Sequence, residues 1–204
     1  GGGTPTTLSA PQLDRLMGEL AEHIDLSGCT EYTVEAGRPD TITAEKLAVL
    51  ARRGCSRVSV NPQTMQDAVL ERMGRAHRAD DILRAYALAR ESGIGCINMD
   101  LIAGLPGDSA AGFRASLEQV LALGPENVTV HTLALKKGSR LMEEGGGLPS
   151  GAAVADMLDF AWAALRAAGQ RPYYLYRQKY MSGSFENVGW CRPGAESLYN
   201  ICMM

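Results

Sequence analysis

The stretch CINMDLIAGLPG, residues 96–107, decides the fold class. Its first seven residues are an apolar, β-prone run of the length of one strand, and a turn built on Pro106 and Gly107 follows. Apolar side chains then recur at helical spacing, at positions 113, 117, 120 and 121. Strand, loop and helix in this order predict one βα unit.

The same unit occurs three more times along the chain. Strands are predicted at residues 31–35, 57–60 and 127–133, and each precedes a loop and a helical stretch. The helical stretch after residue 60 is expected to run to about Arg90. One unit takes about thirty residues, the length of a βα repeat. With a further helix expected from about Pro11 to His23, the pattern predicts a parallel sheet covered by helices.

The last third of the chain has a different character. A glycine-rich stretch at 145–147 with Pro149 and Ser150 is typical of a loop or boundary, so we expect one unit over residues 1–150 and a second over 151–204. An aromatic, irregular tail is expected from about Pro172. Because the chain starts without Met and stops just after an apolar stretch, we expect it to be a fragment of a longer protein.

Composition excludes several classes of protein. The chain has 204 residues, of which 46% are apolar and 21% charged, and this composition argues against disorder. A net charge of −3 leaves no positive excess for nonspecific nucleic-acid binding. Apolar runs are too short for a membrane span, and no signal peptide opens the chain, so a cytoplasmic protein is expected.

The five cysteines have no metal-ligand spacing. They stand at positions 29, 55, 96, 191 and 202, so no CxxC or CxxxCxxC pattern is present. In a reducing compartment such residues are most often small buried apolar side chains.

Polar residues follow the predicted strands, where loops of a parallel sheet build binding sites. Glu35, Gln63, Asp100 and His131 belong to this set, and we expect all four at the carboxyl ends of strands, facing one mouth of the sheet. The glycine triplet at 1–3 would let a polar ligand approach the backbone. A flexible linker could have the same sequence, and this alternative stays open.

Six motifs, in order, carry a resemblance to a known family: GGGTPT (1–6), TVEAGRPD (33–40), VNPQTM (60–65), MGRAH (73–77), INMDLIAGLPG (97–107) and TVHTLALKKGS (129–139). The chain resembles the radical S-adenosylmethionine family of oxygen-independent coproporphyrinogen III oxidases. The segments 173–190 and 193–204 are most similar to its HemZ-type branch. The resemblance implies an α/β fold: a partial (βα)6 barrel, truncated at the N-terminus, with a C-terminal extension. It also implies a [4Fe-4S] cluster that reduces S-adenosylmethionine to a 5′-deoxyadenosyl radical.

The resemblance also implies roles for individual residues. Eight match positions that contact adenosylmethionine in the family: Gly2, Gly3, Thr4, Glu35, Gln63, Arg75, Asp100 and Ala134. Because the family's substrate carries four propionates, we expect Arg177 and Lys179 near it, and we add His131 as a candidate substrate contact. The implied partners are a tetrapyrrole substrate and an electron donor such as flavodoxin or ferredoxin.

One family motif is missing from the chain. The three cluster cysteines of the family, CxxxCxxC, should precede GGGTPT, so no metal ligand is expected in this chain and the chain alone should be inactive. The implied reaction is the oxidative decarboxylation of coproporphyrinogen III to protoporphyrinogen IX. Two alternatives stay open: a haem carrier of the same fold, and a phosphate-binding barrel enzyme supported by the glycine-rich loop alone.

Overall fold

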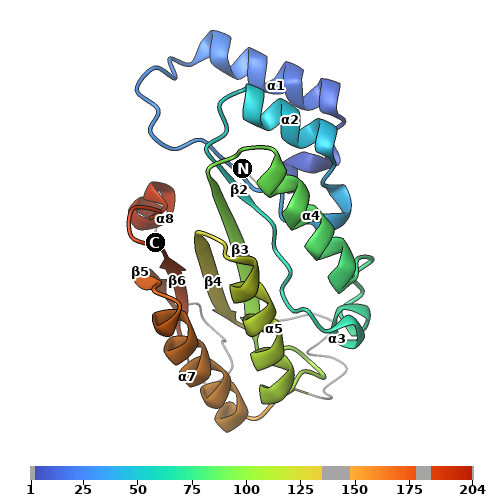
Figure 1. Cartoon of the computed structure of the whole chain (residues 1–204), viewed down its shortest axis with the longest axis vertical. Coiled ribbons are helices and arrows are strands. Elements are labelled where there is room, and N and C mark those ends of the chain that lie inside the picture. The colour runs from blue at the N-terminus through green and yellow to red at the C-terminus, as the bar shows by residue number, and fades with distance from the viewer. Residues whose placement is uncertain (1–2, 135–147, 178–184, 204) are drawn as a thin grey trace.

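A six-stranded sheet forms the centre of the molecule (Figure 1). The structure is a computed structural model that describes residues 3–134, 148–177 and 185–203. In spatial order the strands are β1 (Thr33–Val34), β2 (Arg57–Ser59), β3 (Cys96–Ala103), β4 (Asn127–Thr132), β6 (Asn187–Cys191) and β5 (Arg171–Tyr176). The first four are parallel, and β6 runs antiparallel to both β4 and β5. The predicted α/β class is confirmed.

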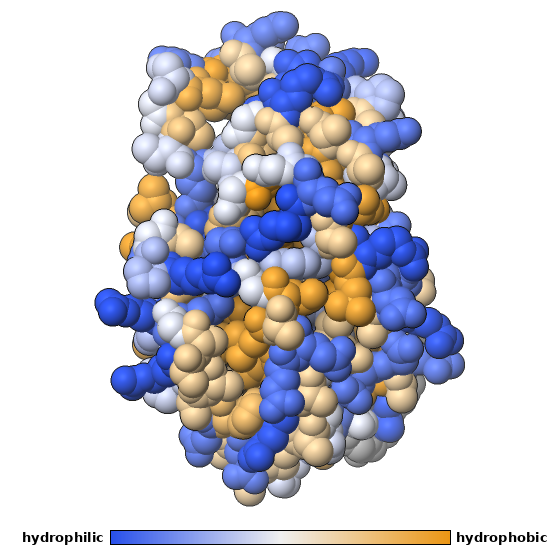
Figure 2. Space-filling view, in the orientation of Figure 1, coloured by the Kyte–Doolittle hydropathy of each residue, from blue (hydrophilic) through white to orange (hydrophobic). Residues whose placement is uncertain are grey.

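Helices precede, connect and follow these strands. They are η1 (Pro5–Thr7), α1 (Ala10–His23), η2 (Pro39–Thr41), α2 (Ala44–Arg52), α3 (Asp67–Arg72), α4 (Ala79–Glu91), α5 (Ala110–Leu123), α7 (Gly151–Ala167) and α8 (Leu198–Met203). Figure 2 shows hydrophilic residues over much of the face that carries α4 and α5, with smaller apolar areas between them. In the described part of the chain, no helix has the length and apolarity to cross a membrane.

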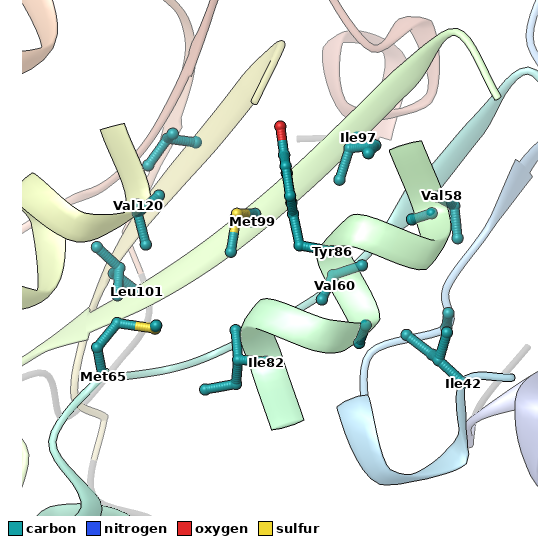
Figure 3. Close-up of a cluster of buried hydrophobic side chains, with 14 of the residues drawn as sticks. Ile42, Val58, Val60, Met65, Ile82, Tyr86, Ile97, Met99, Leu101 and Val120 are labelled. Atoms are coloured by element: carbon teal, nitrogen blue, oxygen red, sulfur yellow. The ribbon is translucent and has the colours of Figure 1, made fainter. Parts of the chain in front are cut away.

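The two faces of the sheet differ in chemistry because side chains alternate along a strand. Val58, Met99, Leu101 and Val128 point to the helix-covered face and are fully buried. Figure 3 shows Ile82 of α4 in this layer with Met99 and Leu101. The intervening residues form what we call the polar face: Thr33, Glu35, Arg57, Ser59, Asn98, Asp100, Thr129 and His131.

Three predicted elements differ from the structure. The helix expected to run to Arg90 is two helices, α3 and α4, because Gly74 takes φ +69° and ends the first. Residues 171–176, expected to be irregular, form the edge strand β5. Of residues 31–35, only Thr33 and Val34 pair with β2. The division of the chain into two units at residue 150 stays a prediction. In the structure, β5 and β6 belong to the same sheet as the first four strands, and α7 packs against α5.

A buried arginine joins the C-terminal segment to the amino ends of the strands. Arg57 is 7% exposed, and its guanidinium donates to Asn127 Oδ1, to Ala195 O at 3.0 Å and to Glu196 O at 3.1 Å. Its Nε lies 3.7 Å from Glu31 Oε1. Glu31 in turn accepts from the Ser197 hydroxyl and the Leu198 amide. We call this set the arginine cluster.

Ser150→Ala is expected to destabilise the protein by about 1 kcal/mol, the usual cost of a lost N-cap. The Ser150 hydroxyl accepts from the Ala153 amide at 3.2 Å and caps α7, which packs against α5. Urea unfolding followed by circular dichroism measures the loss. Ser150→Asp, which can also cap, should restore stability, and equal losses in both variants would contradict the capping role.

Candidate cofactor and substrate site

A cavity of about 320 Å³ opens where β1 and β2 end. It is lined by Gly3, Thr4, Glu35, Gly37, Arg38, Asn61, Gln63 and Arg75. Five of the eight residues predicted to contact the cofactor are in this set. The loops after two neighbouring parallel strands meet there, which is the usual position of a ligand site in such sheets.

The described part of the N-terminal segment, from Gly3 to Thr6, is held beside this cavity by hydrogen bonds to the loop after β1. The Thr6 hydroxyl donates to Ala36 O at 3.0 Å. The Lys46 ammonium donates to Thr6 O at 2.6 Å and to Thr41 O at 2.9 Å. Gly3 takes φ +87°, a conformation that glycine adopts readily. Gly3 and Thr4 therefore form the part of this segment that lines the cavity.

Gln63 and Arg75 form a polar pair in the cavity wall. Gln63 has φ +67°, unusual for a residue other than glycine, and it is held there by bonds to β3. Its amide donates to Asp100 O, and its carbonyl accepts from Ile102 N, both at 2.9 Å. The side-chain Oε1 accepts from Arg75 Nη2 at 3.0 Å. Backbone pairing with β3 thus orients the Gln63 side chain toward the half-buried guanidinium of Arg75.

Glu35 and Asn61 supply acceptors in the same cavity lining. Glu35 Oε2 accepts from the Ser59 hydroxyl at 2.7 Å. Desolvation by surrounding atoms raises the pKa of Glu35, the Ser59 hydrogen bond lowers it, and the negative charge of Asp100 raises it further, so the pKa lies above its ordinary value. Asn61 Oδ1 is buried without a hydrogen-bond partner among the described residues.

These groups fit adenosylmethionine. The cofactor offers an ammonium group, a carboxylate and ribose hydroxyls. Arg75 can pair with the carboxylate, while Glu35 and the unpaired oxygen of Asn61 can accept from the ammonium or a hydroxyl. A buried acceptor without a partner is costly in the free protein, and a donor from the ligand would remove that cost.

In the described part of the chain the cysteines do not converge as ligands of an iron–sulfur cluster, and three of them are poorly suited to bind iron. Burial raises the pKa of Cys55 and of Cys96 to about 11, and that of Cys191 to about 12, which opposes the thiolate that iron requires. Within the described residues, the three potential metal ligands that converge are Glu19, Glu22 and His23, on the exposed surface of α1.

Asp100 and His131 lie together on the polar face, beside the cavity rather than in its wall. Asp100 is the fifth residue of the eight-residue β3, so the expectation of a strand-end position is wrong; β3 continues because Leu101–Ala103 pair with β4. Asp100 Oδ2 lies 3.6 Å from His131 Nε2, and Asp100 Oδ1 accepts from Asn98 Nδ2 at 2.7 Å. Ala134, two residues beyond β4, is also absent from the described cavity lining.

Of the remaining predicted site residues, one is described by the structure and two are not. Arg177 is described and forms an exposed ion pair with Glu186. Gly2 and Lys179 lie outside the described residues. Of the other histidines, His77 is buried and His23 bonds Glu19 O on the surface of α1.

Three cavity residues were missed by sequence reasoning. Gly37, Arg38 and Asn61 line the cavity, and all three belong to motifs that carried the family resemblance. Asn61 stands two residues before Gln63, so the alternation of a β-like segment could have placed both side chains on one side.

Comparison with known proteins decides the family. Residues 1–120 match the sequence profile of the Radical SAM superfamily. The chain belongs to the radical SAM superfamily. Within it, the chain is 44% identical to the oxygen-independent coproporphyrinogen-III oxidase-like protein HemZ of Bacillus subtilis, over 100% of this chain and 41% of that protein. It is 33% identical to the haem chaperone HemW of the same organism, over 98% of this chain and 51% of that protein.

A solved structure supports the same placement. Coproporphyrinogen III oxidase HemN from Escherichia coli, a radical SAM enzyme, matches with a TM-score of 0.80 and 28% identity. The match covers 96% of this chain and 43% of that chain. This radical SAM chain thus shares the HemN fold and spans about two fifths to one half of the relatives it matches. The predicted resemblance is confirmed.

Glu35→Gln is expected to stabilise the ligand-free radical SAM chain at neutral pH. Since folding raises the pKa of Glu35 above its ordinary value of 4.5, the wild-type chain loses stability relative to the variant as pH rises through the folded-state pKa. The difference in unfolding free energy, measured in urea between pH 4 and pH 8, should grow with pH. A difference independent of pH would contradict the desolvation of Glu35; Glu71→Gln on α3 is the exposed control.

Proposed function

We propose that the parent protein of this chain oxidatively decarboxylates coproporphyrinogen III to protoporphyrinogen IX. The observation that carries the proposal is the cavity lined by Arg75, Gln63, Glu35 and the unpaired oxygen of Asn61, a combination of one cation and several acceptors that suits adenosylmethionine. The similarity to HemZ and HemN supports the tetrapyrrole substrate and the reaction. Membership of the radical SAM superfamily argues against the phosphate-binding alternative.

In this proposal the chain binds and orients, while the cofactors supply the reactivity. Bound adenosylmethionine with a [4Fe-4S] cluster would supply a 5′-deoxyadenosyl radical that takes a hydrogen atom from the β carbon of a propionate and becomes 5′-deoxyadenosine; loss of CO₂, with one electron passed to an acceptor outside these residues, would then leave a vinyl group, twice per substrate. Arg75 and Gln63 hold the carboxylate end of the cofactor. Glu35 and Asn61 accept from its donors. The cluster ligands and the electron donor, such as flavodoxin or ferredoxin, lie outside these residues.

The experiment is an anaerobic assay of the full-length parent. The protein is reconstituted with iron and sulfide, reduced, and given adenosylmethionine and coproporphyrinogen III; products are oxidised and separated by chromatography. Protoporphyrin and 5′-deoxyadenosine formed together support the proposal. Formation of 5′-deoxyadenosine without any vinyl product would contradict the assigned substrate.

A haem carrier is the second candidate, favoured by the 33% identity to HemW. A carrier should bind haem stoichiometrically through an axial ligand such as His or Cys. On the polar face, His131 is the described imidazole that could serve. Titration of the parent with haemin, followed by the Soret band in wild type and His131→Ala, separates the carrier from the enzyme.

A further inference from the structure

A glycine in β6 allows a tyrosine from β5 to lie across it. Cross-strand pairing places Asp100, Thr129, Gly189 and Tyr174 in one row over four strands. A Cβ at position 189 would come 1.8 Å from Tyr174 Cε1 and 2.3 Å from Cδ1, closer than atoms can approach. The Tyr174 ring therefore fills the space that a side chain at 189 would take. Because directly paired residues carry their side chains on the same side of a sheet, this row places the ring on the polar face with Asp100 and Thr129.

Tyr176 extends this aromatic surface toward the candidate site. The Tyr174 and Tyr176 rings are parallel, with 7° between their planes and 6.2 Å between their centroids. The Tyr176 hydroxyl lies 3.5 Å from His131 Nδ1, and the two rings meet edge to face. Both tyrosines are half-buried. We call Tyr174 and Tyr176 the tyrosine pair.

The tyrosine pair is joined to the cofactor side of the site through two residues. His131 stands between Tyr176 and Asp100, 3.6 Å from the carboxylate. Asp100 O accepts from the amide of Gln63, which lines the cavity. A tetrapyrrole that rests one ring on the tyrosine pair and extends over His131 and Asp100 would therefore reach toward the cavity assigned to the cofactor.

We propose that the tyrosine pair, seated over Gly189, is the surface on which one pyrrole ring of a propionate-bearing tetrapyrrole stacks; this rests on the proposed function. Pyrrole rings are flat and electron-rich, and parallel aromatic side chains bind such rings by stacking. The reduced macrocycle also carries N–H donors, and the polar face beside the tyrosine pair offers the oxygens of Asp100 and Thr129. Tyr174, Tyr176 and Gly189 are therefore specificity-determining positions.

The test measures ligand affinity in the full-length parent. Coproporphyrin III is titrated by fluorescence and haemin by absorbance, so that the affinities for a propionate-rich porphyrin and for haem are compared. Adenosylmethionine is titrated by calorimetry. Tyr174→Leu is expected to weaken coproporphyrin III binding about tenfold, or about 1.4 kcal/mol. Gly189→Ala should cause a similar loss because it displaces the Tyr174 ring. Tyr174→Phe, which keeps the ring, should bind much like wild type.

Two controls separate this role from a structural one. Leu175→Ala changes the residue between the two tyrosines, which is 63% exposed on the other side of β5, and should leave tetrapyrrole affinity unchanged. Adenosylmethionine affinity should be the same in all variants, which also shows that they fold.

Three results would overturn the inference. Equal tetrapyrrole affinity in wild type, Tyr174→Leu and Gly189→Ala would remove the tyrosine pair from the substrate site while leaving the proposed function standing. Loss of adenosylmethionine affinity alone would assign the pair to the cofactor. A wild-type parent that binds neither coproporphyrin III nor haemin would overturn the proposed function as well.

Discussion

Arg57→Ala is expected to lower the free energy of unfolding by about 3–5 kcal/mol, the range found when one partner of a buried ion pair is removed. The guanidinium bonds Asn127 and the carbonyls of Ala195 and Glu196, and it neutralises Glu31, whose side chain is 12% exposed. Its removal leaves the mostly buried Glu31 carboxylate without its ion-pair partner and takes one donor from Asn127 and from each of the two carbonyls. Urea unfolding of the 204-residue chain measures the loss.

The matched control is Arg53, which pairs with Asp14 at 2.8 Å on the surface between α1 and α2. Solvent screens that pair, so Arg53→Ala should cost much less than Arg57→Ala. Arg57→Met fills the volume without the charge and should also destabilise strongly. Equal effects at positions 53 and 57 would show that the arginine cluster is not an important source of stability.

The sequence predicts the buried strands of the sheet better than its edge strand. The apolar periodicity around residues 96–102 and 127–133 identified β3 and β4, because a buried strand depends mainly on its own side chains. β5 was missed: Pro172 lacks an amide donor, and only the edge position, where one side of the strand is unpaired, makes it acceptable. That position follows from pairing with β6, which local sequence does not encode.

In the candidate site, too, some residues could be predicted from the sequence and others could not. Glu35, Gln63 and Arg75 were predicted through motifs, and the structure brings all three to one cavity. Their convergence depends on the backbone of Gln63 bonding to β3, a contact between separate motifs. Gly189 lies in a segment that resembles the family, but its role could not be predicted, because its importance lies in the Tyr174 ring that crosses it. Predicting such a residue requires the register of β5 on β6.

Arg75→Ala in the full-length parent is expected to weaken adenosylmethionine binding by about 1.5–3 kcal/mol, roughly 10- to 150-fold, the contribution of a hydrogen bond to a charged group. Arg75 supplies the guanidinium that lines the cavity together with Arg38, but Arg38 is engaged with Asp40 at 2.7 Å. Arg75 Nη2 donates to a neutral amide oxygen, so its charge stays available for the carboxylate of the ligand.

Calorimetric titration of the anaerobic parent with adenosylmethionine measures this effect, and two further variants interpret it. Arg75→Lys keeps the charge without the two-pronged donor geometry and should recover only part of the affinity. Arg78→Ala removes an exposed arginine that pairs with Asp67 outside the cavity, and it should bind like wild type. If Arg75→Ala and Arg78→Ala bind adenosylmethionine equally well, the carboxylate is held elsewhere. The cavity at the ends of β1 and β2 would then lose its assignment as the methionyl site, since Arg38, the other cation of the described lining, is paired with Asp40.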